Sequence, residues 1–179
     1  MHILVINGSP KGKYSITLQT CEYLKILHPE HEFEVLHAGQ RIKALEKDFS
    51  PAMAALERAD ALIFAYPVYT FIAPCQLHRF IELMKEHHAP VAGKFATQIT
   101  TSKHFYDVTA HRYVEDNGHD LGLRPVRGLS ADMEDLLTEQ GQKQAVDFFR
   151  HFLWCREKGY AESVSPKVIL LISVFLQLI

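Results

Sequence analysis

The chain has 179 residues, of which 47% are hydrophobic and 22% charged, the balance of an ordinary globular protein. Its 19 Lys and Arg against 21 Asp and Glu give a formal net charge of −2, which argues against nucleic-acid binding, where a basic surplus is usual. Cys21, Cys75 and Cys155 form no CxxC pair, so they support neither a disulfide framework nor a zinc or iron–sulfur site.

Both ends of the chain carry apolar runs, and neither predicts a membrane span. The first, residues 3–6, stops at Asn7 and is too short for the core of a secretory leader, so we expect a cytoplasmic protein. The second, residues 168–179, would reach only about 18 Å as a helix, short of the roughly 30 Å hydrocarbon core. We therefore divide the chain into a domain over 1–158 and an apolar tail over 159–179.

Short apolar runs alternate with amphipathic stretches along the first domain. In chain order the patterns predict strand 2–6, helix 15–27, strand 33–37, helix 50–58, strand 61–65, helix 74–87, strand 94–101, helix 106–117, strand 123–129 and helix 142–156. Strands that alternate with helices in this way predict an α/β fold. We expect a doubly wound parallel sheet of five strands in the order 2-1-3-4-5, with helices on both faces.

In such a sheet, ligands bind beyond the carboxyl ends of the strands, where strands 1 and 3 lie side by side. The loop after the first strand, residues 7–17, is rich in small and hydroxyl residues and leads into a helix N-terminus, which favours an anion. Its hydroxyl residues Ser9, Ser15 and Thr17 are candidate donors to a phosphate. The alternative is an ordinary strand-to-helix turn in which Ser15 caps the helix.

Two common nucleotide-binding patterns are absent from this loop. Only three residues separate Gly8 from Gly12, and Tyr14 follows Lys13, so the Walker pattern is not met. The G-x-G-x-x-G pattern is missing as well. These absences weigh against an ATPase and against an ordinary Rossmann dehydrogenase.

The loops after the third and fourth strands combine rigidity, aromatic rings and hydroxyls. Residues 66–74 hold two prolines and three aromatic residues, a composition that suits a flat aromatic ring system, although Tyr69 and Phe71 are equally compatible with packing under the next helix. Residues 101–107 add further hydroxyl and aromatic groups. Together the three loops favour a mononucleotide with a large ring, such as FMN.

The motifs in these loops resemble a known family. Residues 8–11 (GSPK), 67–69 (PVY) and 76–80 (QLHRF), with the TTSKHFYD stretch at 100–107 and GLSADM at 128–133, resemble the flavodoxin-like NAD(P)H-dependent FMN reductases and related NAD(P)H-dependent oxidoreductases. The resemblance covers roughly residues 1–158. It extends to the iron–sulfur flavoproteins, but this chain lacks their cluster cysteines, so we expect no cluster and no other metal.

The resemblance implies non-covalent FMN and assigns residues to it. The expected cofactor-binding residues are Ser9, Lys11, Ser15, Ile16 and Thr17 in the first loop, Pro67, Val68, Tyr69, Thr70 and Phe71 in the second, and Thr101, Ser102 and His104 in the third. One of these positions departs from the family pattern. The family's usual Arg after GSP is Lys11 here, which keeps the charge and loses bidentate geometry.

The activity that the resemblance implies is transfer of a hydride from NAD(P)H to FMN, and then of electrons to a flavin, a quinone, a nitro or azo compound, or a protein. No catalytic side chain is expected, because the chemistry belongs to the cofactor. The resemblance also implies a homodimer. Two alternatives on the same fold are a flavodoxin-type electron carrier, which would be expected to carry a more acidic surface, and a flavin-free binding domain.

The histidines and their acidic neighbours suggest no second chemistry. Most of the histidines are expected to be surface residues, and no zinc-protease pattern is present. Asp107 and His111 stand four residues apart, and we expect a local pair on one helix rather than a catalytic dyad.

Overall fold

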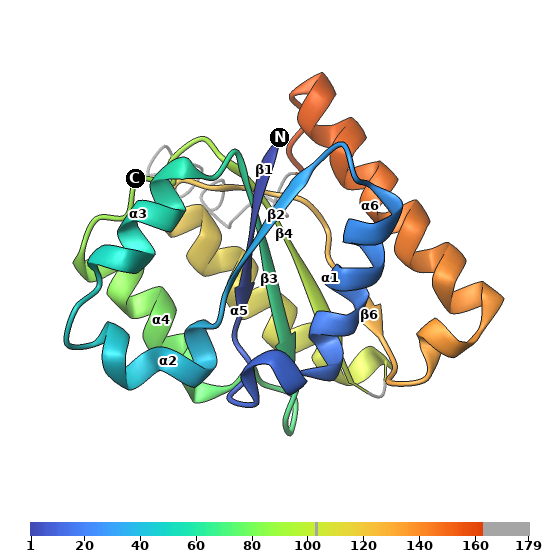
Figure 1. The fold of residues 1–179 in the computed structure, drawn as a ribbon, viewed down its shortest axis with the longest axis horizontal. Helices are drawn as coiled ribbons and strands as arrows, with labels where there is room; N and C mark the ends of the chain where they lie inside the picture. The colour runs from blue at the N-terminus through green and yellow to red at the C-terminus, as the bar shows by residue number, and fades with distance from the viewer. Residues whose placement is uncertain (103, 163–179) are drawn as a thin grey trace, which may run out of the picture.

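The computed structural model describes residues 1–102 and 104–162, without the side chains of His104 and Phe105, and shows a twisted parallel sheet between two layers of helices (Figure 1). The strands lie in the order β2-β1-β3-β4-β5, with β6 also paired to β4, which confirms the predicted doubly wound arrangement. Their bounds are β1 His2–Asn7, β2 Glu32–Leu36, β3 Ala61–Pro67, β4 Phe95–Thr101, β5 Arg124–Pro125 and β6 Leu129–Ala131.

The helices form the outer layers. The α-helices are α1 Ile16–Leu27, α2 Ala38–Leu45, α3 Ser50–Arg58, α4 Cys75–Glu86, α5 Val108–Asp120 and α6 Glu139–Lys158, and the short 3-10 helices are η1 Gly12–Tyr14, η2 His104–Asp107 and η3 Asp135–Leu137. Figure 1 shows α1 and α6 on one face of the sheet and the other α-helices on the opposite face.

The central strands β1 and β3 bury both of their faces, as strands inside a parallel sheet do. Along β1, Leu4 and Ile6 belong to the core under α2–α5, whereas Ile3 and Val5 belong to the core under α1 and α6. All four side chains are fully buried. The sequences of β1 and β3 therefore contain continuous apolar runs, which is why the sequence alone revealed these strands.

The structure differs from the predicted elements at two places. Helix α2 was not predicted, because it is short, only Ile42 and Leu45 are large apolar residues, and Gly39 weakens the helical pattern. That glycine is needed because a Cβ there would lie 2.3 Å from the Gly8 carbonyl oxygen. The predicted fifth strand over 123–129 is two short pieces, β5 and β6, which both pair with β4. Between them Gly128 lies so close to Gln98 that a Cβ would stand 2.4 Å from its side chain.

Two helix ends also differ from expectation. Helix α5 continues through Gly118 to Asp120, because Gly118 is buried against Leu123 and Pro125 and packing outweighs its poor helix propensity. Helix α6 begins at Glu139, where the Thr138 hydroxyl accepts a hydrogen bond from the Gly141 backbone N–H.

Within the part of the chain that the structure describes, no helix has the length and apolar character needed to cross a bilayer. The expected apolar tail lies outside the described residues from residue 163 onward.

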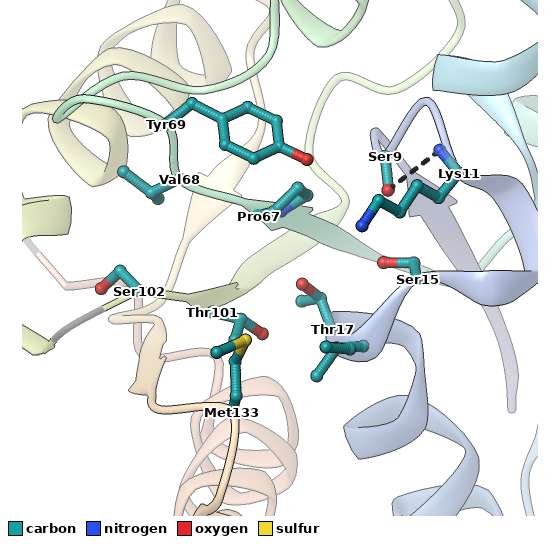
Figure 2. Close-up of a pocket in the computed structure, with 11 residues that line it drawn as sticks. Ser9, Lys11, Ser15, Thr17, Pro67, Val68, Tyr69, Thr101, Ser102 and Met133 are labelled. Carbon is teal, nitrogen blue, oxygen red and sulfur yellow. Dashed lines mark hydrogen bonds between the residues drawn. The ribbon is translucent and has the colours of Figure 1, made fainter.

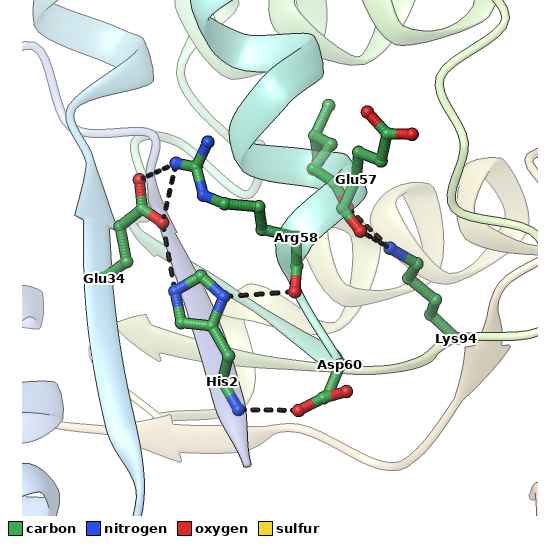
Figure 3. A network of polar contacts seen from close by, with 7 residues as sticks. His2, Glu34, Glu57, Arg58, Asp60 and Lys94 are labelled. Atoms are coloured by element: carbon green, nitrogen blue, oxygen red, sulfur yellow. Dashed lines mark hydrogen bonds and ion pairs between the residues drawn. The ribbon is translucent and has the colours of Figure 1, made fainter.

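At the amino end of the sheet, polar groups pair with one another in hydrogen bonds and ion pairs (Figure 3). The His2 ring lies 3.0 Å from the Glu34 carboxylate, and Arg58 donates to the same carboxylate at 2.9 Å. The His2 backbone N–H donates to Asp60 at 2.7 Å and lowers the pKa of that carboxyl. Lys94 donates to the last carbonyls of α3, at Leu56 and Glu57, as a cation at a helix C-terminus does.

Candidate functional site

A cavity of about 260 Å³ lies at the opposite, carboxyl edge of the sheet, between the loops that follow β1, β3, β4 and β6 (Figure 2). This is the edge at which doubly wound sheets bind their ligands. The lining residues are Ser9, Lys11, Ser15, Ile16, Thr17, Pro67, Val68, Tyr69, Thr101, Ser102 and Met133. Ten of these eleven are sequence-predicted site residues, so the fold brings the three predicted loops together around one space.

The loop after β1 supplies two buried hydroxyl groups that no described residue pairs with. Ser15 occupies the N-cap position of α1 in an extended conformation, but its side chain makes no capping bond. Ser15 Oγ and Thr17 Oγ1 are both buried, and neither has a hydrogen-bond partner among the described residues. A buried hydroxyl left unpaired costs about 1–3 kcal/mol, so its persistence points to a ligand. Figure 2 shows both hydroxyls directed into the cavity.

Charge and backbone at this loop favour an anion. The side chain of Lys11 reaches toward Ser15 at the edge of the cavity (Figure 2). The Lys11 backbone N–H donates to the Ser9 hydroxyl at 3.3 Å. The first turn of α1 adds the unpaired N–H groups and the positive end of the helix dipole. A cation, hydroxyls and a helix N-terminus together are the chemistry of a phosphate site.

The loop after β3 ends in a tight turn. The backbone N–H groups of Tyr69 and Ile72 each donate to the other residue's carbonyl, at 3.0 and 3.2 Å. The two residues between them, Thr70 and Phe71, have φ of 50° and 72°, a left-handed conformation that costs a residue with a side chain. Tyr69 lines the cavity, while Thr70 and Phe71 lie at the tip of the turn beside it.

The cavity wall formed by the residues after β4 is held in place by β6. Ser102 donates its backbone N–H to the Ala131 carbonyl at 2.9 Å, which continues the pairing of β4 with β6. That pairing leads the chain on to Met133, a lining residue that sequence analysis did not predict. Its position depends on the split fifth strand, and the GLSADM motif at 128–133 is the signal in the sequence that could have indicated it. The side chain of His104 is not among those that the structure describes, so its role stays a prediction.

Asp107 and His111 hold this same loop. The Thr100 hydroxyl donates to Asp107 at 2.5 Å, and His111 Nε2 lies 2.8 Å from that hydroxyl and 3.3 Å from the carboxylate. Burial would raise the pKa of the Asp107 carboxyl, but hydrogen bonds from His111 and Thr100 outweigh it and hold the pKa far below the usual value. The predicted local helix pair is therefore also a buried anchor between α5 and β4.

Residues 1–113 of the chain match the family described as NADPH-dependent FMN reductase. This chain belongs to that family. The resemblance seen in the sequence motifs is thereby confirmed. As a family member the protein is an NAD(P)H-dependent oxidoreductase with FMN as its cofactor. A search of curated protein sequences gives no match.

Several solved structures share the fold. One is the apo form of an NADH:FMN oxidoreductase (EMOB), with a TM-score of 0.71 and 23% identity over 92% of this chain and 91% of the other. The NAD(P)H:(acceptor) oxidoreductase FerB of Paracoccus denitrificans has a TM-score of 0.65 and 17% identity, over 85% and 97%. An FMN-dependent NADH-azoreductase of Bacillus anthracis, in complex with FMN, has a TM-score of 0.56 and 12% identity, over 85% and 97%.

The cavity passes a chemical test for the family's cofactor. FMN carries a phosphate, a polar chain and a flat ring, and the lining offers two buried unpaired hydroxyls, a lysine and an apolar wall that includes Pro67 and Val68. No Asp, Glu, His or Cys is among the described lining residues. This lining suits binding and orientation of a cofactor rather than acid–base catalysis by a side chain.

Proposed function

We propose that this cavity binds FMN non-covalently, with the phosphate on the loop after β1. The orphaned hydroxyls of Ser15 and Thr17 carry this proposal, because they are buried donors that a phosphate would satisfy. Ser9, Lys11 and the backbone at Ile16 complete the phosphate end.

At the ring end, the proposal assigns the walls of the cavity to the flavin ring and its ribityl chain. The residues assigned are Pro67, Val68, Tyr69, Thr101, Ser102 and His104, with Thr70 and Phe71 at the border. The chemistry that FMN supplies when bound is acceptance of a hydride from NAD(P)H and delivery of electrons to a second substrate. The chain's own part is to bind, to orient and to shield: Pro67 stiffens the ring-side loop, and the Tyr69 turn stands at the mouth.

The phosphate assignment is tested by comparing FMN with riboflavin, which lacks the phosphate. In the Ser15→Ala/Thr17→Val variant we expect FMN to bind at least about tenfold more weakly, the loss of roughly 1.4 kcal/mol, while riboflavin affinity changes little. Quenching of flavin fluorescence measures both. Ser50→Ala, an exposed hydroxyl at the start of α3, is the matched control. Equal losses for both flavins would contradict the assignment.

For the second substrate, we propose a small, flat, conjugated acceptor, such as a flavin, a quinone, or an aromatic nitro or azo compound. Support comes from the half-exposed aromatic rings beside the cavity, where Phe71 and Tyr106 lie 5.3 Å apart. Solved structures of similar fold include an NADH-azoreductase and an NAD(P)H:quinone oxidoreductase. Steady-state assays with each compound, against ferricyanide as a non-stacking acceptor, test the preference. Phe71→Ala should raise the KM for the conjugated acceptors only.

We also propose a homodimer that covers the rim of the site. Exposed apolar side chains gather on the loops at this edge, among them Tyr14, Ile16, Met133 and Leu137. An exposed apolar surface of this kind is typical of an interaction site. Light scattering on a sizing column should give about twice the chain mass of 20.5 kDa, and Leu137→Asp should shift it toward the monomer. A monomer at micromolar concentration would refute the proposal.

A further inference from the structure

Asn7, the last residue of β1, lies directly under the loop proposed to hold the phosphate. Its side chain is fully buried and makes three polar contacts. Oδ1 accepts from the Ser9 backbone N–H at 3.1 Å, and Nδ2 donates to the Gly12 carbonyl at 2.8 Å. The carboxamide therefore spans the loop from its second residue to η1.

These two backbone contacts determine which way the amide points. The opposite orientation would set the amide N–H against the Ser9 N–H and the amide oxygen against the Gly12 oxygen. Nδ2 must then be the atom that faces His37 Nδ1, at 3.1 Å. Because Nδ2 is a donor, a hydrogen bond between these two atoms requires the ring nitrogen to accept, which it does only in the neutral tautomer that carries its proton on Nε2.

His37 stands where β2 passes into α2, and the first turn of α2 packs against the same loop. A Cβ on Gly39 would meet the Gly8 carbonyl oxygen, and one on Gly12 would meet the Gln40 side chain at 2.3 Å. Gly12 itself has φ of +56°, so the loop is held in a conformation that few residues adopt. The β2–α2 connection thus supports the loop by packing and, through His37, by a hydrogen bond.

We propose that Asn7 and His37 are positioning residues for the phosphate loop. The Asn7 carboxamide holds Ser9 and Gly12 in the binding arrangement, and the neutral His37 ring holds the carboxamide in place. Neither side chain lines the cavity, so both act through the loop. The inference rests on the proposed function only where FMN is the readout. The hydrogen-bond pair itself can be tested without any flavin.

The flavin-free test is the tautomer of His37. NMR of the protein labelled with ¹⁵N-histidine should show a ring that is protonated at Nε2 and whose signals are absent from the His37→Asn variant, which assigns them to His37. In Asn7→Asp a carboxylate oxygen replaces Nδ2 as the group facing the ring, so the same ring should gain a proton at Nδ1. A His37 ring protonated at Nδ1 in the unmodified chain would overturn the pair, whatever the flavin results.

The functional test uses FMN and riboflavin binding on folded variants. Asn7→Ala should weaken FMN at least about tenfold and riboflavin by no more than about twofold. His37→Asn, whose side-chain oxygen takes the place of Nδ1, should stay within about threefold of the unmodified chain, whereas His37→Leu should lose about fivefold or more. Lys43→Ala, an exposed residue on α2, is the control.

Double substitution separates a coupled pair from two independent effects. If His37 acts through Asn7, the Asn7→Ala/His37→Leu variant should bind FMN no more weakly than Asn7→Ala alone. Additive losses, or unchanged FMN affinity in His37→Leu, would overturn the inference. If the unmodified chain binds riboflavin as tightly as FMN, the phosphate assignment fails, while the tautomer measurement still decides whether the pair exists.

Discussion

The two ends of the parallel sheet differ in how fully their polar groups are paired and in how strained their backbone is. At the amino end, the polar groups of His2, Glu34, Arg58, Asp60 and Lys94 all find partners within the protein (Figure 3). At the carboxyl end, two buried hydroxyls lack partners among the described residues, and two consecutive residues with side chains hold a left-handed backbone. The network at the first end satisfies its own polar groups, whereas the second end keeps unsatisfied and strained groups, as binding sites often do.

The largest effect is expected where the carboxyl end is itself anchored. Asp107→Ala removes the partner of His111 and Thr100 and leaves both groups in a buried site, so we expect a loss of about 3 kcal/mol in the free energy of unfolding. Urea denaturation measures it. Asp116→Ala, which removes a solvent-exposed pair with Arg112, should stay within about 0.5 kcal/mol. Equal losses would mean that the anchor contributes nothing specific.

The same carboxyl should make stability depend on pH. Hydrogen bonds hold its pKa in the folded state below that of the unfolded chain. Its contribution is therefore complete above about pH 4 and is lost as the pH falls toward the folded-state pKa. Urea unfolding between about pH 7 and about pH 3 should show a weaker acid loss in Asp107→Asn than in the unmodified chain. Parallel curves would assign the acid sensitivity to other groups.

Removing the unpaired hydroxyls should leave fewer unsatisfied polar groups at the carboxyl end, as at the amino end, and so should stabilise the flavin-free protein. Ser15→Ala and Thr17→Val delete buried donors that have no partner among the described residues, so together they should stabilise the flavin-free protein by about 1–2 kcal/mol. Thermal unfolding without and with FMN measures the effect. The stabilisation by added FMN should shrink in the same variant. A less stable flavin-free variant would show that these hydroxyls support the fold.

Relaxing the strained turn should have a smaller effect. Thr70→Asn/Phe71→Gly installs the residues that a turn with two positive φ angles prefers, and we expect a gain of about 1 kcal/mol. The reciprocal control is Gly93→Ala, at φ of +79° with open space around it, which should cost about 1 kcal/mol through the backbone alone. Urea denaturation of both variants, compared with the unmodified chain, provides the measurement.

The smallest effect is expected at the surface of the amino end. Arg58→Ala removes a half-exposed ion pair with Glu34 and should cost less than about 1 kcal/mol. High salt should reduce the difference further, because exposed pairs are screened. A larger loss would mean that this network contributes more than its exposure implies, and it would narrow the contrast between the two ends.

Apart from α2 and the division of the fifth strand, the sequence by itself determined the order of strands and helices, the parallel sheet and the three loops that meet at its carboxyl edge. Buried strands such as 61–65 and amphipathic helices such as 74–87 are local patterns, and the rules of chain connection then limit the topology. That Ser9, Ser15 and Thr17 lie at the cavity was predictable for the same reason. They were picked out because they lie between the end of a strand and the start of the next helix, two features that are close together along the chain.

Only the tertiary structure decided how the loops are held. Met133 reaches the cavity through β6, Asp107 and His111 anchor to Thr100, and Asn7 faces His37 thirty residues away in the chain. Each contact joins segments with no shared periodicity, so no local pattern encodes it. The physical reason is that packing and buried hydrogen bonds between distant elements override local propensity, as the existence of α2 already shows.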